Sequence, residues 1–340
     1  MKPYRPARAP GHFIREELEA RDLAQRDLAF ILGTSEQVVA RLLSGKQSIS
    51  PEMAKALGQA FDINAEVFVR LQAAYDLANA KEPDNALAER ARWQNLYPVR
   101  EMINRGWLDE QSIESQLCHL FKAANSNEIA EPANAAKKTN VGEPASGAQL
   151  AWLYRVIQIA EAAKDVPAYS ERALQDSQIK LRALMKRPEG IRKVPDVLMA
   201  CGLRFIIVES LPNAKIDGVC IWLDSKTPVV GMSLRFDRID NFWFVLCHEL
   251  AHVLNRDGKH ENEQGWILDV ELEKERAGDS EKNSKQERRA NQLAASFCIP
   301  DHEMVSFASR RIFYSERDVL AFAERMGVHP GIVVGQIHNR

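Results

Sequence analysis

An apolar run at residues 242–254, FWFVLCHELAHVL, contains two histidines and a glutamate, and it constrains the fold more than any other part of the chain. Imidazole and carboxylate groups are costly to bury unless another group pairs with them. In a helix, His248 and His252 lie on one face about one turn apart, because they are four residues apart. The run therefore predicts a buried helix whose polar groups share a partner.

The pattern His-Glu-x-x-His is typical of zinc hydrolases. Two imidazoles at this spacing can bind one Zn²⁺, and Glu249 is placed to take a proton from a water that the metal activates. We therefore predict one zinc ion per chain, with His248 and His252 as ligands and Glu249 as the catalytic base. The alternative is a buried polar cluster in a protein that has lost its metal.

A catalytic zinc needs a third protein ligand. The metzincin pattern would place a histidine at position 258, which is Gly258, and His260 has the wrong spacing. Glu287 is the better candidate, because it stands four residues before Asn291 on one predicted helix, QERRANQLAASF. Glu287 would then bind the metal, as in gluzincin peptidases, and Asn291 would hydrogen-bond a ligand histidine.

The segments around this motif predict the fold class of the C-terminal part. Residues 203–210, 217–224 and 227–234 are short β-rich runs separated by turn residues, so we expect three strands directly before the motif helix. The charged stretch 256–285 has few apolar anchors and is expected to be a loop. Together these features predict an α+β, zincin-like domain whose small sheet lies next to the motif helix.

The N-terminal part is predicted to be an all-α domain that contains a helix-turn-helix. The segment QRDLAFILGTSEQVVARLLSGK reads as two helices joined by a short turn around Gly33. Ala29 is small enough for close helix packing. The apolar residues expected to form the shared core are Leu28, Ile31, Val39 and Leu42.

Polar residues of this segment are candidates for DNA contact. Those expected to face base edges from the second helix are Ser35, Glu36, Gln37 and Arg41. Those expected to lie on phosphates are Gln25, Arg26, Lys46 and Gln47. Basic and acidic residues nearly balance over the first 80 positions, so a monomer would bind weakly, and a homodimer on a palindromic double-stranded operator would double the contacts. A small helical bundle used for protein contacts is the alternative.

Length and composition set the remaining bounds. A chain of 340 residues is too long for one ordinary core, and its net charge of -2 gives no whole-chain case for nucleic-acid or membrane binding. No apolar run is long enough to span a bilayer, and five widely spaced cysteines are no disulfide framework. We expect a cytoplasmic, multi-domain protein with a helix-turn-helix domain at 1–83, a helical connector and linker at 84–148, and a metallopeptidase domain at 149–340.

Two resemblances agree with this division. HELAH, the preceding IDGVCIWLDSKTPVVGMSLRFDRIDNFWFVL, the following ERRANQLAASFCIP and the terminal VHPGIVVGQ resemble the ImmA/IrrE family of metallopeptidases over residues 150–340. The resemblance implies zinc held by His248, His252 and Glu287, with Glu249 as general base. Arg289 departs from the family, in which a second acidic residue is frequent. In some family members the activity cleaves a DNA-binding repressor.

Residues 11–80 resemble the Cro/XRE-type domain of HigA-like antitoxins. PGHFIREELEARDLAQRDLAFILGTSEQVVARLLSGKQSISPEMAKALGQAF carries the likeness, and the tail NAEVFVRLQAAYDLANA supports this subgroup. The resemblance implies operator binding and autoregulation as a dimer.

Two functions of different class follow from the sequence. The first is a DNA-binding, antitoxin-like regulator whose zinc endopeptidase domain hydrolyses a peptide bond in a partner protein, either a substrate or a toxin. The second is a non-proteolytic HigA-like antitoxin or autorepressor whose metal domain is a sensor or a partner-binding module. A peptidase also needs a donor for the developing oxyanion. By residue type alone, the candidates are His302, His329 and His338.

Overall fold

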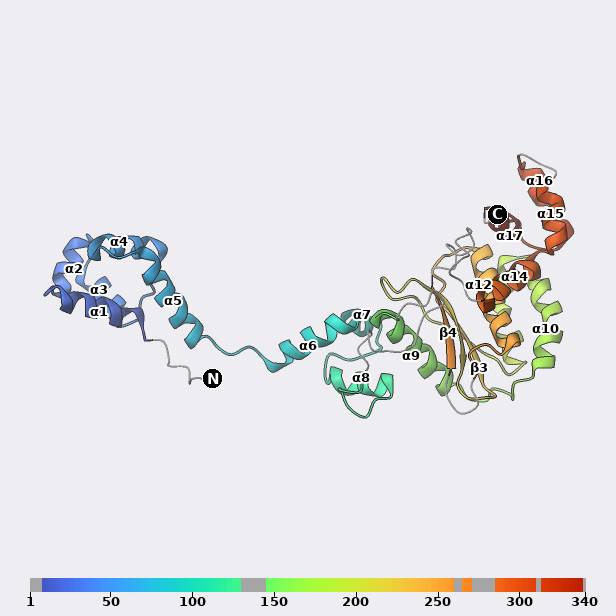
Figure 1. Cartoon of the computed structure of the whole chain (residues 1–340), viewed down its shortest axis with the longest axis horizontal. Coiled ribbons are helices and arrows are strands. Elements are labelled where there is room, and N and C mark those ends of the chain that lie inside the picture. The colour runs from blue at the N-terminus through green and yellow to red at the C-terminus, as the bar shows by residue number, and fades with distance from the viewer. Residues whose placement is uncertain (1–7, 130–144, 260–264, 271–284, 310–312, 339–340) are drawn as a thin grey trace. The chain divides into compact units, whose positions relative to one another are not determined.

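The computed structural model describes residues 8–129, 145–259, 265–270, 285–309 and 313–338. The chain divides into two compact units, Met1–Asn85 and Ala86–Arg340 (Figure 1). Residues 130–144 of the expected connector and linker, as well as His260, lie outside the described residues. Within the described part of the chain, no helix combines the length and the apolar character that crossing a bilayer requires.

The described residues of the first unit form five helices, and the predicted all-α character is confirmed. They are α1 (Pro10–Ala20), α2 (Gln25–Ile31), α3 (Glu36–Leu43), α4 (Pro51–Phe61) and α5 (Ala65–Asn79). The Ser50 hydroxyl accepts a hydrogen bond from the Met53 N–H at the start of α4, where Pro51 occupies the first helical position. Gly33 has a positive φ of 60° in the turn between α2 and α3, a conformation that favours glycine.

The core of this unit differs from the expectation at one position. Leu28, Val39 and Leu42 are buried as predicted, but Ile31 is 47% exposed, so its expected place in the core is wrong. Leu32, four residues after Leu28, packs against the core instead. The helical repeat makes Leu32 as good a neighbour of Leu28 as Ile31, and only the angle between the helices decides which is buried.

The second unit has a four-stranded mixed sheet at its centre. The strands are β1 (Arg204–Ile207), β2 (Ile216–Trp222), β3 (Pro228–Met232) and β4 (Gly265–Val270), in the order β1-β3-β2-β4. β1 and β3 are parallel, whereas β2 is antiparallel to both β3 and β4. The fold class is therefore as the sequence predicts.

Strand β4 lies in the stretch 256–285 that was expected to be a loop, and for these residues the expectation is wrong. The strand pairs with β2 from Trp222 opposite Gly265 to Ile216 opposite Val270. Its existence depends on the free edge that β2 offers, which a local apolar pattern does not reveal.

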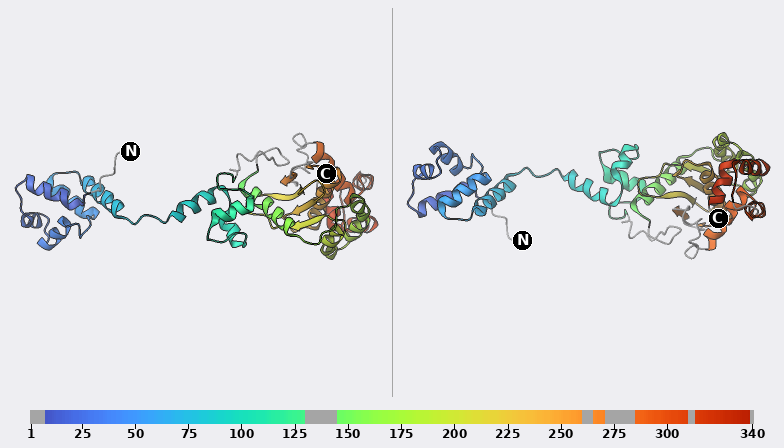
Figure 2. Two further views of the ribbon diagram at one scale, coloured as in Figure 1. Left: turned by 90° about the horizontal axis from the view of Figure 1, so that it is seen from below. Right: turned by 90° about the horizontal axis from the view of Figure 1, so that it is seen from above.

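One face of the sheet is covered by the helices of the first half of this unit. They are α6 (Asn85–Leu96), α7 (Val99–Asn104), α8 (Ile113–Phe121) and α9 (Gly147–Ala162). Trp93 and Trp152 are fully buried in a core that includes Val219, Ile221 and Val229 of the sheet. Both views of Figure 2 show the teal helices before α9 close to the green α9. The helices expected to form a separate connector thus share the core of the second unit, because their large apolar side chains pack on α9.

The other face of the sheet is covered by a second group of helices. They are α10 (Glu171–Leu184), α11 (Val194–Met199), α12 (Ile239–Asn255), α14 (Lys285–Cys298), α15 (Asp301–Ser309), α16 (Glu316–Met326) and α17 (Pro330–His338). Cys220, Trp222 and Val230 of the sheet share a core with α12, as their alternation along the strands requires. Helix α12 is buried from Asn241 to Val253, with β2 and β3 on one side and α14 on another (Figure 1).

Candidate metal centre

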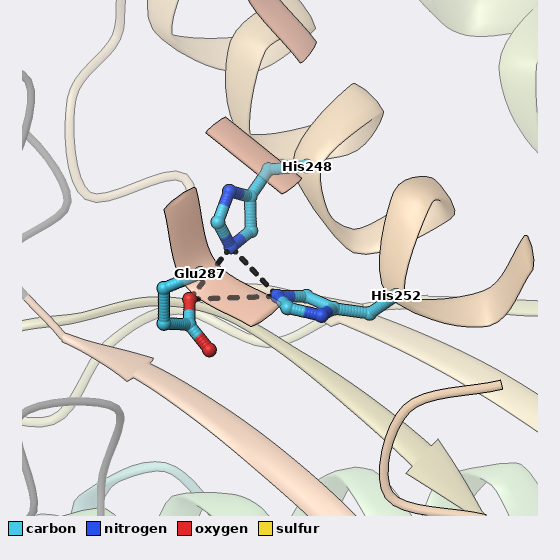
Figure 3. A group of neighbouring side chains, drawn as sticks. All are labelled: His248, His252 and Glu287. Atoms are coloured by element: carbon cyan, nitrogen blue, oxygen red, sulfur yellow. Dashed lines mark hydrogen bonds and ion pairs between the residues drawn. The ribbon is translucent and has the colours of Figure 1, made fainter. Parts of the chain in front are cut away.

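Three metal-ligating side chains meet between α12 and α14. His248 and His252 lie one turn apart on α12, and Glu287 belongs to the first turn of α14. Figure 3 shows the two imidazoles and the carboxylate pointing toward one another. All three side chains are buried. The sequence-predicted ligands are therefore brought together in space.

The ligand atoms have the spacing that a tetrahedral metal site requires. Nε2 of His248 lies 2.9 Å from Nε2 of His252, and Oε2 of Glu287 lies 3.3 Å and 3.5 Å from these two atoms. Zinc bonds of about 2.0–2.2 Å at tetrahedral angles place neighbouring ligand atoms about 3.4 Å apart. The two-nitrogen, one-oxygen donor set is also one of those that catalytic zinc sites use. These residues could hold a divalent metal such as zinc.

Each histidine is oriented through its second ring nitrogen. Oδ1 of Asn291 lies 3.0 Å from Nδ1 of His248, which is the contact expected from the Glu287–Asn291 spacing. Oδ2 of Asp257 lies 2.9 Å from Nδ1 of His252. An acceptor at Nδ1 fixes the tautomer in which Nε2 carries the lone pair, so both Nε2 atoms are prepared to bind a cation.

Asp257 is a residue of this site that sequence reasoning missed. It follows Arg256, the left-handed residue that caps the C-terminus of α12, and its backbone N–H donates to the carbonyl of His252. Gln286 donates to its Oδ1 at 3.1 Å, and the indole N–H of Trp222 donates to its carbonyl at 3.1 Å. The only sequence signal was an acidic residue directly after the motif helix, at the start of a charged stretch.

Glu249 is fully buried between α12 and strand β2. Gly218 of β2 faces its carboxylate so closely that a Cβ at this position would overlap Oε1. Because a glycine is required there, β2 and α12 together define where this carboxylate lies. The position directly after His248 brings the Glu249 backbone next to the ligand group.

The pKa of Glu287 reflects its position between the histidines. Burial raises this pKa. Hydrogen bonds to His248 and His252 and the charge of these rings together lower it by more, so the net shift is strongly downward. The carboxylate therefore stays ionised. An ionised carboxylate facing two imidazole nitrogens suits a cation.

The three histidines considered as oxyanion donors either make another contact or are exposed. Nδ1 of His329 accepts a hydrogen bond from the N–H of Gly331 at the start of α17, which is a helix-capping contact. His302 and His338 are exposed. Cys247, beside the first ligand, is buried, and burial together with a contact to Cys298 raises the pKa of its thiol well above the ordinary value.

In the first unit, α3 presents polar side chains to solvent. Ser35, Glu36, Gln37 and Arg41 are exposed, whereas Val39 and Leu42 of the same helix face the core. Nε2 of Gln25 donates to the carbonyl of Glu36 at 3.1 Å, so this side chain joins the first turns of α2 and α3.

The other three residues expected to contact phosphates lie near α3 in the sequence. Arg26 and Lys46 are exposed, and Gln47 is half-buried. Ile31 and Phe30, at the end of α2, are exposed as well.

Comparisons with known proteins agree with this arrangement. A helix-turn-helix family matches residues 14–68, and a peptidase family described as an IrrE N-terminal-like domain matches residues 205–337. The chain is similar to the uncharacterized HTH-type transcriptional regulator YddM of Escherichia coli, with 32% identity over 73 residues, which are 22% of this chain and 78% of that protein. The chain belongs to the HTH-type transcriptional regulators that bind DNA, and it carries an IrrE N-terminal-like, metallopeptidase-type domain.

Proposed function

We propose that this regulator is a zinc-dependent endopeptidase that hydrolyses a peptide bond of a partner protein. One observation carries the proposal: His248, His252 and Glu287 converge within 3.5 Å of one another, and Glu249, the residue directly after His248, is fully buried. The set contains three ligands and a base, which is the minimum for metal-assisted hydrolysis.

The residues around the ligands support this chemistry. Zn²⁺ bound here would lower the pKa of a water toward about 7 and polarise a peptide carbonyl. Asp257 and Asn291 accept from the Nδ1–H groups of the two histidines, so both imidazoles face the metal position in the binding tautomer. Glu249 would accept the proton of the attacking water and deliver it to the leaving amide nitrogen. Close packing of α12 against Gly218 of β2 would keep this carboxylate in place during the proton transfer.

The first unit would bring the peptidase to DNA. We propose that α3 reads an operator through Ser35, Glu36, Gln37 and Arg41, and that Gln25, Arg26, Lys46 and Gln47 lie near phosphates. The polar side chains of α3 are exposed, whereas its apolar side chains face the core, and this arrangement supports the role. A homodimer on a palindrome would supply the second set of contacts that a nearly uncharged unit needs. The cytoplasm is where such a protein meets an operator.

The biological role we propose is that of an antitoxin-like regulator of a toxin–antitoxin or phage-related module. The likeness of residues 11–80 to HigA-like antitoxins is the support. The partner cleaved would be a protein substrate or the toxin itself.

A non-proteolytic regulator is the second candidate, and one observation favours it. YddM is matched over 78% of its length by only 22% of this chain, so a regulator of this type needs no peptidase domain. The second unit would then hold a metal in order to sense it or to bind a partner.

Metal content and a base variant separate the two functions. Elemental mass spectrometry of the purified full-length protein is expected to give about one zinc per chain, and Glu287→Ala is expected to lose it. Glu249→Gln is expected to keep the zinc and to lose cleavage of the partner protein. If Glu249→Gln behaves like the unaltered chain in every assay of function, the non-proteolytic reading stands. Absence of zinc after re-addition would overturn both metal-dependent readings.

A further inference from the structure

The turn that follows α12 connects the metal centre to a separate pocket of about 460 Å³. Arg256 and Lys259 line this pocket, and Asp257 between them holds His252. Trp222 also lines the pocket, and its indole N–H donates to the Asp257 carbonyl. The pocket and the metal centre therefore share one short segment of backbone.

Positive side chains dominate the lining of this pocket, which we name the basic pocket. Four cations line it, namely Arg204, Lys226, Arg256 and Lys259. The acidic residue in the lining is Glu171, whose Oε2 accepts from Nε and Nη2 of Arg256 at 3.2 Å and 2.9 Å. The lining thus has an excess of three positive charges, in a chain whose net charge is -2.

Two of the three remaining cations contact neutral groups. The Lys259 ammonium lies 4.9 Å from the centre of the Trp222 ring, and Nε of Arg204 donates to the carbonyl of Ala160. Lys226 is exposed, and Oδ1 of Asp224, two residues before it, accepts a hydrogen bond from the Lys226 backbone N–H at 2.7 Å. Among the described residues, no ion pair joins these three side chains to a carboxylate.

We propose that the basic pocket binds a small phosphate-bearing anion of about nucleotide size. Three separate chain segments bring four like charges together here, at a Coulomb cost that a bound anion offsets. The volume falls within the range of about 300–1,000 Å³ of small-molecule sites. Guanidinium and ammonium groups are the phosphate ligands that proteins use most. Arg256 can exchange the Glu171 carboxylate for a phosphate, so Glu171 holds this side chain in place until the anion binds.

The shared turn couples this pocket to the metal centre. An anion that draws Arg256 away from Glu171 acts on the residue directly before Asp257, and contact with Trp222 acts on the hydrogen bond to the Asp257 carbonyl. Either change moves the acceptor that orients His252. Occupancy of the basic pocket therefore changes zinc affinity, and zinc changes anion affinity by the same factor. This coupling rests on the proposed zinc site, whereas anion binding itself does not.

Isothermal titration calorimetry of the full-length protein tests the binding. The probes are inorganic pyrophosphate, ADP and adenosine, each titrated into zinc-loaded and into chelator-treated protein at physiological ionic strength. We expect a dissociation constant below about 1 mM for pyrophosphate or ADP. Equal affinity for the two would identify phosphate as the recognised group, and tighter binding of ADP would add a contact with the nucleoside. Adenosine binding as tightly as ADP would overturn the proposal.

A double variant assigns the binding to the pocket. Lys226→Ala together with Lys259→Ala is expected to weaken binding at least tenfold, because two charged contacts are lost. The matched control is Lys122→Ala together with Lys186→Ala, which removes two lysines that form exposed ion pairs elsewhere in the second unit. It is expected to bind like the unaltered chain. Equal affinity of the two double variants, or the absence of heat up to about 5 mM ligand, would overturn the proposal. So would binding that chelator treatment abolishes and the lysine variants do not change, since the metal would then be the anion site.

A chelator-competition measurement tests the coupling separately. Zinc affinity measured with and without saturating pyrophosphate is expected to differ in the unaltered chain and to be equal in the Lys226→Ala, Lys259→Ala protein. An unchanged zinc affinity in the unaltered chain, with pyrophosphate bound, would overturn the coupling and leave the binding site in place.

Discussion

Nδ1 of His252 lies 2.9 Å from Oδ2 of Asp257, five residues further along the chain. This contact places a carboxylate behind one ligand histidine, and an amide, Asn291, stands behind the other. The carboxylate is fixed in turn by Gln286 of α14 and through its backbone by Trp222 of β2. The orientation of one ligand thus depends on three separate parts of the second unit.

Asp257→Asn is expected to weaken zinc binding by about 10–100-fold, the usual effect of losing a carboxylate behind a ligand histidine. The amide removes the charge that makes the imidazole a stronger donor to the metal. Competition with a chromophoric chelator measures the affinity. Asp224→Asn is the control, because that carboxylate accepts hydrogen bonds only within its own turn among the described contacts. Equal zinc affinity in both variants would contradict a role for Asp257 in ligand orientation.

Gly218→Ala is expected to displace the Glu249 carboxylate and to reduce peptide hydrolysis by about 100-fold, since a shift of about 1 Å can cost that much. Zinc content should stay near one per chain, because Gly218 does not face the ligands. Gly231→Ala is the matched control. It crowds Val219 and Val156 on the opposite face of the same sheet, so it should destabilise the fold without lowering the activity of the folded protein. Loss of zinc in Gly218→Ala would show that the Glu249 carboxylate and the metal ligands are not positioned independently.

The sequence predicted the elements whose evidence is local. His248 and His252 share a face because the helical repeat places them there, and Glu287 and Asn291 follow from the same four-residue spacing. Asp257 and strand β4 could not be predicted in this way. Both lie in a charged stretch, and each acquires its role from a distant partner: Asp257 from the end of α12 and Gln286, and β4 from the edge of β2. The error at Ile31 has a similar cause, since two positions of one helix compete for a single place in the core.

The lowered pKa of Glu287 predicts how acid destabilises the metal-free protein. The folded chain keeps this carboxylate ionised at pH values where the unfolded chain binds a proton, because the unfolded pKa is near the ordinary 4.5. The contribution of Glu287 to the free energy of unfolding is therefore complete above about pH 4.5. It is lost as the pH falls further, and the free energy of unfolding then changes by up to about 1.4 kcal/mol per pH unit. Denaturant unfolding of the second unit, followed by tryptophan fluorescence between pH 3 and 6, measures this slope. Glu287→Gln should flatten it, whereas Glu324→Gln, at an exposed site, should not. Identical slopes in all three proteins would contradict the lowered pKa.

Substitutions on α3 and after it are expected to separate sequence reading from general DNA affinity. Arg41→Ala removes an exposed side chain of α3 and should cost about 1–3 kcal/mol on the operator while leaving binding to unrelated DNA nearly unchanged. Lys46→Ala should weaken binding to every sequence and reduce the dependence of log affinity on log salt by about one, because one phosphate contact is lost. Fluorescence anisotropy with operator and scrambled duplexes at several salt concentrations measures both effects. Arg70→Ala, which removes an exposed cation of α5 paired with Glu66, is expected to change neither. If Arg41→Ala weakens binding to both duplexes equally, Arg41 contacts the phosphate backbone, and base reading must then come from the other exposed residues of α3.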